Sequence, residues 1–261
     1  MVGKNLKMPV VFIGHGSPMN AIEDNEFAKG WQGIAAKTPR PKAILCISAH
    51  WYGEGTFVTS AITPGLIYDF YGFPEELYGK QYPAKGAPAL ALRVKEAVKS
   101  VKVRLDEIRG LDHGTWVVLY RMYPEADIPV IQLSIDGNLS PKEQFKIGQE
   151  LSVLRDEGVL ILGSGNIVHN LSLVDYDANP YDWAKEFDGF VSKSLEQKDT
   201  KALFEWKQNK NGKLANPFED HFVPLFYVLG ASGGETPRFS VENIFAGSLS
   251  MRCAVFGGLD G

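Results

Sequence analysis

Five histidines are the residues of this chain whose type and spacing are best suited to chemistry. Each lies in a short motif rich in Gly, Ser, Asp or Asn, and at least three directly follow apolar runs that predict buried strands. Imidazole is the commonest protein ligand for metals and the usual proton carrier near neutral pH. Because open α/β folds place their chemistry at strand ends, the pattern predicts that these side chains converge on one metal. They are His15, His50, His113, His169 and His221.

Three of them are predicted to mark the ends of three separate strands. Glycines on both sides of His15 remove side-chain bulk, so another group can approach it closely. If the first two strands are neighbours, as sequential strands often are, His15 and His50 meet at one edge of the sheet. The strand and histidine pairs are Pro9–Gly14 with His15, Ala43–Ser48 with His50, and Val159–Gly163 with His169.

The other two histidines are predicted to lie near the start of helices. His113 precedes the helix Thr115–Met122, where the helix dipole favours a neutral imidazole that can hydrogen-bond or exchange protons. His221 lies near the start of the helix Phe218–Leu229, directly after two acidic residues. One residue of the segment 219–221 can therefore complete a facial triad of metal ligands.

Three protein ligands leave coordination positions open, and open positions distinguish a catalytic metal from a structural one. A carboxylate as the third ligand would give the triad of non-haem Fe(II) oxygenases. A histidine in that place is equally typical of a zinc hydrolytic site. The ligand chemistry alone leaves both alternatives open, with Glu219 and Asp220 as the carboxylates and His221 as the imidazole.

Strands and helices alternate along the chain, and several of the strands are continuously apolar. This pattern is typical of an α/β fold with a mostly parallel or mixed sheet that helices cover on both faces. No Gly-, Ser- or Pro-rich linker divides the chain, so we expect one domain over residues 1–261. The further predicted strands are Thr56–Thr59, Val101–Leu105, Pro129–Ile135 and Leu249–Phe256, and the further predicted helices are Asn20–Lys37, Ala87–Lys99, Pro141–Glu157, Tyr181–Leu195 and Ala202–Gln208.

The segment Ile62–Lys85 has a different character, because turn residues and aromatic residues are interleaved along it. So many prolines and glycines preclude a long regular element. So many aromatic residues argue against a simple solvated linker. We expect an ordered loop that either caps the core or closes as a lid over a pocket.

The overall composition excludes several classes of partner. The chain has 261 residues, of which 44% are hydrophobic and 22% charged, as in ordinary globular proteins. A net charge of -4 without any Lys/Arg cluster argues against nucleic acid or an anionic membrane as the partner. The apolar stretch Pro9–Ile13 is too short for a signal-peptide core, and no segment is apolar enough to span a bilayer, so we expect a cytoplasmic protein.

Cys46 and Cys253 lie inside apolar runs, which predicts buried, reduced thiols.

Taken in order, the motifs around the histidines resemble those of the class III extradiol ring-cleaving dioxygenases, and within them the 4,5-DOPA extradiol branch. The resemblance spans nearly the whole chain. A Gly-His-Gly-Ser stretch alone is a weak signal, whereas the ordered set is a specific one. The motifs are Gly14-His15-Gly16-Ser17-Pro18-Met19-Asn20, Ser48-Ala49-His50-Trp51, Gly110-Leu111-Asp112-His113-Gly114-Thr115-Trp116, Gln132-Leu133-Ser134-Ile135-Asp136, Gly163-Ser164-Gly165-Asn166-Ile167-Val168-His169-Asn170, His221-Phe222-Val223-Pro224-Leu225 and Gly247-Ser248-Leu249-Ser250-Met251.

This resemblance implies a three-layer α/β/α sandwich and a metal-dependent enzyme that opens the ring of a catechol, such as a DOPA-like compound, with dioxygen. It implies that His15, His50 and His221 bind the metal, which is Fe(II) in the working enzyme and can be replaced by Zn(II) in a structure. His169 matches the residue that acts as base and acid, and it could also reach the metal as a fourth ligand. His113 matches a second histidine near oxygen and substrate.

Two other functions use the same residues. A zinc-dependent hydrolase needs the same three histidines around an open metal position. A metal- or tetrapyrrole-binding protein without catalytic activity is the second alternative, because chelatases also carry a Gly-His-Gly-Ser stretch. The motif Asp112-His113-Gly114 argues against this second alternative, because it adds a residue suited to proton transfer.

Overall fold

The computed structural model describes residues 7–258 of the chain. The predicted domain 1–261 therefore also includes residues 1–6 and 259–261, which lie outside the described part. The strands are β1 Val10–Gly14, β2 Ala43–Gly53, β3 Thr56–Thr59, β4 Val103–Asp106, β5 Val130–Asp136, β6 Val159–Gly165, β7 Pro237–Ser240, β8 Ile244–Phe245, β9 Leu249–Ser250 and β10 Cys253–Phe256. The α-helices are α1 Glu26–Lys37, α2 Glu75–Tyr78, α3 Pro88–Ala97, α4 His113–Met122, α5 Pro141–Leu151, α6 Asp182–Glu196, α7 Thr200–Phe204, α8 Gly212–Ala215 and α9 Pro224–Ala231. Short 3-10 helices are η1 Pro18–Ala21, η2 Ser152–Glu157, η3 Leu171–Leu173 and η4 Trp206–Gln208.

One mixed sheet organises the fold, as the alternating pattern predicts. Its strand order is β4-β3-β5-β2-β6-β1-β10-β7, with β8 and β9 forming a separate small ribbon. The four central strands, β5, β2, β6 and β1, are parallel to one another. The strands β3 and β10 are antiparallel to their central neighbours β5 and β1. All four carboxyl ends of the central strands therefore lie at the same edge of the sheet.

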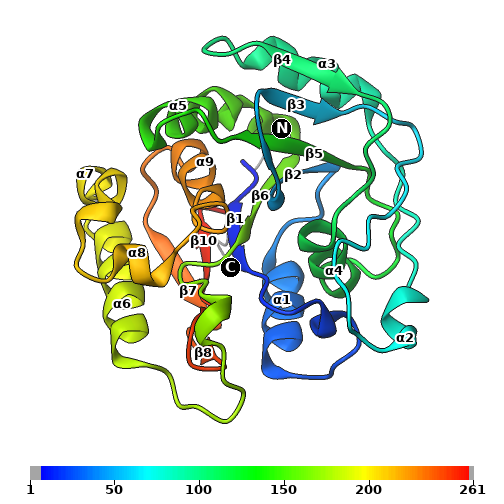
Figure 1. Ribbon diagram of the computed structural model, residues 1–261. Coiled ribbons are helices and arrows are strands. Elements are labelled where there is room, and N and C mark those ends of the chain that lie inside the picture. The colour runs from blue at the N-terminus through cyan, green and yellow to red at the C-terminus, as the bar shows by residue number, and fades with distance from the viewer. Residues whose placement is uncertain (1–6, 259–261) are drawn as a thin grey trace.

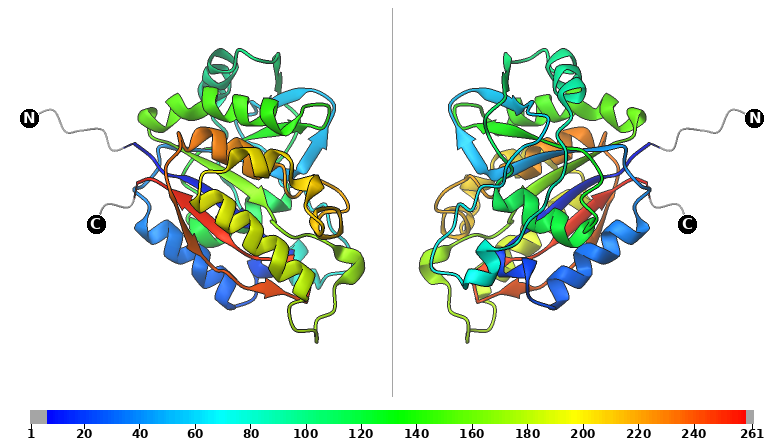
Figure 2. Two further views of the ribbon diagram at one scale, coloured as in Figure 1. Left: turned by 90° about the vertical axis from the view of Figure 1, so that its left-hand side faces the viewer. Right: turned by 90° about the vertical axis from the view of Figure 1, so that its right-hand side faces the viewer.

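Helices cover both faces of this sheet, which confirms the predicted α/β/α sandwich (Figure 1). One face carries α3, α5, α6 and α9, and the other carries α1 and α4, as the two side views show (Figure 2). Side chains alternate along β1 between the two cores, because successive residues of a strand point to opposite faces. Val10 and Phe12 belong to the first core, whereas Val11 and Ile13 belong to the second.

The expected adjacency of the first two strands is wrong, since β6 lies between β1 and β2. All seven positions of β6 are buried, which suits the strand to a central place between two apolar neighbours. The registers nevertheless align the strand ends, because Ile13 and Ser48 are both level with Ser164 of β6. The two histidines that follow Ile13 and Ser48 by two residues are thus brought to one edge.

The second strand also runs further than the apolar pattern predicts. β2 continues to Gly53, so His50 lies within the strand and not after it. The pairing of β2 with β5 shifts register between Ile47 and Tyr52, which is the mark of a bulge. Bulges re-aim side chains beside active sites, and His50 falls inside this irregular stretch.

The first predicted helix begins six residues late. α1 starts at Glu26 because the side chain of Asn25 accepts hydrogen bonds from the backbone N–H groups of Phe27 and Ala28. The preceding segment forms η1, which begins with Pro18 and is capped by Ser17. The prediction of a helix over Asn20–Lys37 is therefore wrong for its first two turns.

Three predictions in the C-terminal third need correction for similar local reasons. The helix predicted over Phe218–Leu229 begins only at Pro224, since the preceding residues form a turn around the carbonyl of Glu219. The strand predicted over Leu249–Phe256 is two strands, because Met251 donates its N–H to Asn243 and leaves the ladder. The helix predicted over Ala202–Gln208 is α7 followed by η4, and β7 was not predicted at all.

The aromatic segment 62–85 is ordered, as its composition predicts, and contains only the short α2. Leu66 bridges to Leu111 as a short parallel pair, and Ile67 donates its N–H to the carbonyl of Leu111 at 2.8 Å. The indole N–H of Trp116 on α4 donates to the carbonyl of Ile67 at 3.2 Å. The ring of Tyr68 packs against Trp116 with centroids 5.5 Å apart. The segment is therefore fixed beside the start of α4.

Candidate metal centre

All five histidines line one cavity at the carboxyl edge of the sheet. The cavity has a volume of about 450 Å³. Its polar floor is made by the histidines together with Asp69 and Ser17, and its walls are largely aromatic and aliphatic. The walls include Phe70, Tyr71, Phe73, Leu171, Val174, Tyr176, Phe245 and Leu249. The prediction that the five imidazoles gather in one place is therefore confirmed.

His15 and His50 face each other through their Nε2 atoms, which lie 3.1 Å apart. The hydroxyl of Ser164 donates to the carbonyl of Gly114 at 2.5 Å, so its oxygen accepts from Nδ1 of His15 at 3.0 Å. On the far side of His50, a carboxylate oxygen of Asp69 lies 3.4 Å from Nδ1. The proton of His15 is therefore on Nδ1, and its Nε2 lone pair points at Nε2 of His50.

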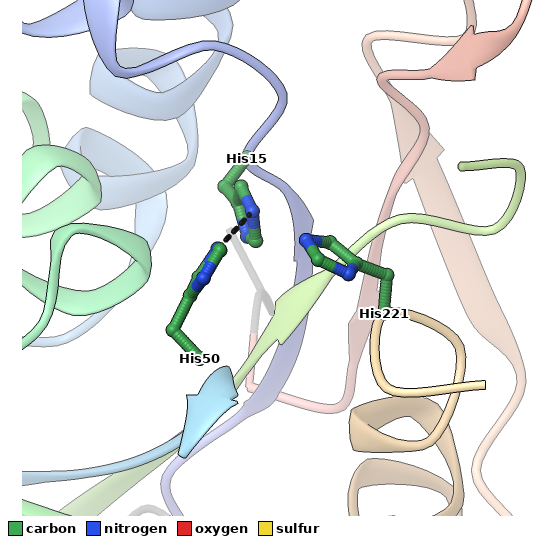
Figure 3. Close-up of side chains that lie close together, drawn as sticks. All are labelled: His15, His50 and His221. Carbon is green, nitrogen blue, oxygen red and sulfur yellow. Dashed lines mark hydrogen bonds between the residues drawn. The ribbon is translucent and has the colours of Figure 1, made fainter. Parts of the chain in front are cut away.

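His221 completes this group from the turn that precedes α9 (Figure 3). One ligand atom from each of His15, His50 and His221 lies within 4.8 Å of the others. The carbonyl of His221 accepts the N–H of Asn166 at 2.8 Å, which ties the turn to the end of β6. The Nδ1 atom of His221 is buried without a hydrogen-bond partner among residues 7–258, although Asp220 Oδ1 lies 3.0 Å away at an unsuitable angle.

Neither acidic neighbour of His221 belongs to this three-nitrogen group. Glu219 instead accepts a hydrogen bond from the hydroxyl of Tyr52 at 3.0 Å and pairs with Lys207. Asp220 accepts the backbone N–H of His221 at 2.8 Å. Both carboxylates therefore make their contacts at the turn and are not part of the cavity floor.

The donor set fits a divalent transition metal. Two nitrogens that bind one metal at 2.0–2.1 Å with tetrahedral or right angles lie about 2.9–3.4 Å apart. The 3.1 Å between the Nε2 atoms of His15 and His50 falls in this range. The nitrogen of a neutral imidazole is a suitable ligand for iron or zinc.

His113 opens α4 beside this group. Asp112 caps the helix by accepting the N–H of Thr115, and its carboxylate also accepts from Ser48 on β2 at 2.7 Å and from Gln132 on β5 at 2.6 Å. These bonds place the ring of His113 against that of His50, with centroids 3.9 Å apart. The predicted helix is present, but it begins at His113 and not at Thr115, so His113 is its first residue and does not lie in a turn before it.

Asp69 is a residue of this centre that the motif analysis missed. Its Oδ1 atom accepts both the backbone N–H and the Nδ1–H of His113, at 3.0 and 2.9 Å. The atoms of His50, Asp69 and His113 form a second set within 4.8 Å of one another. Burial would raise the pKa of Asp69, but the bonds and charges of His113 and His50 outweigh it and lower that pKa to about 2.

His169 reaches the cavity from the loop after β6, and its ring lies parallel to that of His221 at 3.5 Å. It is not a member of either candidate ligand set. Its backbone N–H donates to the carbonyl of Ala215 at 2.8 Å, whereas neither ring nitrogen has a hydrogen-bond partner within residues 7–258. The ring nitrogens of His169 are therefore free to meet a ligand in the cavity.

Burial keeps four of the five histidines neutral, namely His15, His50, His169 and His221. It lowers the pKa values of His15 and His221 well below 6.5, and the neighbouring imidazoles act in the same direction. Burial likewise lowers the pKa values of His50 and His169 to about 4. At pH 7 these rings can therefore accept a metal or a proton.

These pKa shifts predict that the metal-free protein loses stability in mild acid. When the pKa of a histidine is about 4 in the folded chain and 6.5 in the unfolded chain, the unfolded state binds more protons as the pH falls. The contribution of His50 or His169 is complete above pH 6.5 and is lost as the pH falls toward 4, by on the order of 3 kcal/mol for one group. Urea unfolding of chelator-treated protein at pH 7.5 and pH 5 should show the lower midpoint at pH 5, and equal midpoints would contradict this.

A second prediction concerns the contact between β6 and the His221 turn. A Cβ added at Gly165 would lie 2.1 Å from the carbonyl oxygen of His221, so Gly165→Ala must displace the turn. We expect zinc affinity, measured by chelator competition, to fall about 10- to 100-fold, which is the usual loss when a residue that orients a metal ligand is replaced. Gly189→Ala is the matched control, because a Cβ there meets nothing within 4 Å. Equal zinc affinities of the two variants would refute the prediction.

Comparisons with known proteins agree with this geometry. The family described as the catalytic LigB subunit of aromatic ring-opening dioxygenase matches residues 9–256. A protein of Escherichia coli K12 named 4,5-DOPA dioxygenase extradiol is 46% identical over 96% of this chain and 95% of its own length. A protein of the same name from Beta vulgaris is 40% identical over 91% of this chain and 92% of its own. The crystal structure of an uncharacterized protein from Escherichia coli K12 superimposes with a TM-score of 0.85 at 42% identity, covering 96% of this chain and 100% of that one.

Proposed function

The chain belongs to the LigB family of aromatic ring-opening dioxygenases, and on that premise we propose that it cleaves catechols in extradiol fashion with dioxygen. The observation that carries the proposal is a floor of five imidazoles, three of which form a possible metal-ligand set, beneath aromatic walls. The names of the relatives from Escherichia coli and Beta vulgaris favour a DOPA-like catechol as the substrate.

We propose His15, His50 and His221 as the metal ligands, with Fe(II) as the working metal and Zn(II) as a competitor for the same nitrogens. The placement of Glu219 and Asp220 at the turn favours His221 as the third ligand. When bound, Fe(II) supplies the Lewis acidity and the redox chemistry that a reaction between catechol and dioxygen requires.

The remaining histidines handle protons in this proposal. His169 is neutral at pH 7 and has free ring nitrogens, so it can accept the proton of a catechol hydroxyl and return it later. The Nδ1–H of His113 is held by Asp69, so its Nε2 is the nitrogen that can exchange a proton with bound oxygen or substrate. His169 stacks on His221 and is outside the ligand sets, which favours the base over the fourth ligand.

The aromatic walls position the ring and exclude water. Phe70 stands edge-on to His113 with centroids 5.5 Å apart and edge-on to Phe73 at the same distance. A planar aromatic substrate gains from contacts with such rings. Removal of water from this cavity strengthens the hydrogen bonds that the histidines make to the reacting oxygens.

The proposal is tested by loading the metal-free protein anaerobically with Fe(II) and adding catechol or L-DOPA with oxygen. We expect equimolar oxygen uptake and a yellow ring-opened semialdehyde, with metal-free protein as the control. Oxygen uptake without a yellow product would exclude extradiol cleavage. A requirement for zinc without any reaction of catechols would instead favour the hydrolase, and metal binding without any turnover would favour the non-catalytic alternative.

We also propose that the chain forms a single catalytic domain and acts in the cytoplasm. The family match over residues 9–256 and the single eight-stranded sheet support the first point. The two cysteines, Cys46 and Cys253, are both free and buried, which is usual for proteins of a reducing compartment. None of the helices within residues 7–258 is long and apolar enough to cross a membrane.

A further inference from the structure

Asp69 joins the aromatic segment to two of the five histidines. Its Oδ1 atom accepts two hydrogen bonds from His113, and its Oδ2 atom lies 3.4 Å from Nδ1 of His50. Asp69 comes from a segment far from both histidines in sequence, and it is the only acidic residue between Ile62 and Pro74. One carboxylate therefore contacts a proposed metal ligand and a proposed proton carrier at once.

The segment holds Asp69 firmly in place. Residues 65–67 pair with Leu111. The pairing ends at residue 67, two residues before Asp69, and at Leu111, two residues before His113. The hydroxyl of Tyr68 donates to the carbonyl of Lys80 at 2.6 Å, and Phe70 packs against His113. The carboxylate is thus presented by a short, hydrogen-bonded ladder with aromatic neighbours on both sides.

A carboxylate in this position determines which nitrogen carries the proton. An ionised carboxylate only accepts hydrogen bonds, so the Nδ1 atoms that face it must carry hydrogen. For His113 this leaves the Nε2 lone pair available to the cavity. For His50 it leaves the Nε2 lone pair that lies 3.1 Å from Nε2 of His15. Partners of this kind orient ligating imidazoles and raise their basicity.

We propose that Asp69 is a positioning residue that sets the tautomers of His50 and His113 and so couples the aromatic segment to the metal centre. This inference rests on the proposed function, because it assigns the two histidines their roles as ligand and proton carrier. A role as a direct metal ligand is the competing explanation, since Asp69, His50 and His113 form the second candidate ligand set.

The test compares Asp69→Asn with Glu76→Gln. The first change keeps the shape of the side chain but replaces one of its two acceptor oxygens with an N–H donor, so that only one of the two histidines can still face an acceptor. The second is the matched control, since Glu76 lies in the same segment and, among residues 7–258, its carboxylate pairs only with Lys80. We expect Asp69→Asn to lower kcat about 10- to 100-fold and to weaken zinc affinity within the same range, with KM for the catechol changed less than about threefold. Glu76→Gln should leave all three quantities unchanged.

Nitrogen-15 NMR of the chelator-treated, metal-free protein reports the tautomers directly, because zinc bound to Nε2 of His50 would itself force the proton onto Nδ1. We expect Nδ1–H forms of His50 and His113 in the unaltered protein and a changed tautomer of at least one of them in Asp69→Asn. Unchanged tautomers would overturn the proposal, as would a kcat within twofold of the original. Complete loss of stoichiometric zinc would overturn it in favour of a ligand role. If no catechol is cleaved by any variant, the proposed function fails, while the tautomer and zinc measurements still decide the role of Asp69.

Discussion

Replacement of His15 by alanine is expected to abolish retention of the metal and to lower turnover more than about a thousandfold. His15 is 2% exposed, and its ring is fixed by Ser164 so that Nε2 already points at His50. Removal of this ring leaves two protein nitrogens of the proposed set, which cannot hold the metal against dialysis. A bound metal supplies several kcal/mol of charge stabilisation, and each 1.36 kcal/mol is tenfold in rate.

The measurement is metal content after dialysis, zinc affinity by chelator competition, and oxygen uptake with catechol. Ser164→Ala provides a graded comparison, because it keeps the imidazole and removes the acceptor of its Nδ1–H together with the hydroxyl that donates to Gly114. We expect that variant to lose about 10- to 100-fold in zinc affinity, which is less than the loss in His15→Ala. Stoichiometric metal in His15→Ala after dialysis would show that the ligand set is a different one.

The convergence of the histidines could be predicted because it depends on where the central strands end. Continuous apolar runs predict the central strands, and parallel central strands bring their carboxyl ends to one edge whatever their order. For this reason the wrong adjacency of β1 and β2 did not affect the prediction that His15 and His50 meet. The register with Ser164 of β6 aligns both strand ends, and no property of a single strand reveals such a register.

The sequence was less informative where long-range contacts decide local structure. The turn that carries His221 looks helical by apolar spacing. In the structure, Asn166 donates its backbone N–H to the carbonyl of His221, and Gly165 lies directly against that carbonyl oxygen. In the sequence, Asp69 is recognisable only as a single acidic residue among aromatic residues. Its contacts with the histidines depend on the tertiary pairing of Leu66 with Leu111. Tertiary contacts override local propensity at both places.

Replacement of His169 is expected to separate metal binding from catalysis. In His169→Gln we expect metal content to remain near that of the original protein and turnover to fall about 10²- to 10⁴-fold, the usual effect of removing a general acid–base group. His169 is outside the three-nitrogen set, its ring nitrogens are free, and burial lowers its pKa to about 4, so it is a neutral base at pH 7. The measurements are metal content, single-turnover rates with catechol, and zinc affinity.

A second variant tests whether the lost group is a proton carrier. His169→Ala opens space beside His221, where the two rings stack at 3.5 Å, so added imidazole can enter and should restore part of the turnover. Leu171→Ala is the control, because Leu171 lines the same cavity, is 66% exposed and carries no proton. We expect its turnover to be insensitive to imidazole. If His169→Gln instead loses zinc affinity as severely as His15→Ala, His169 binds the metal as a fourth ligand, and the proton must be taken by His113.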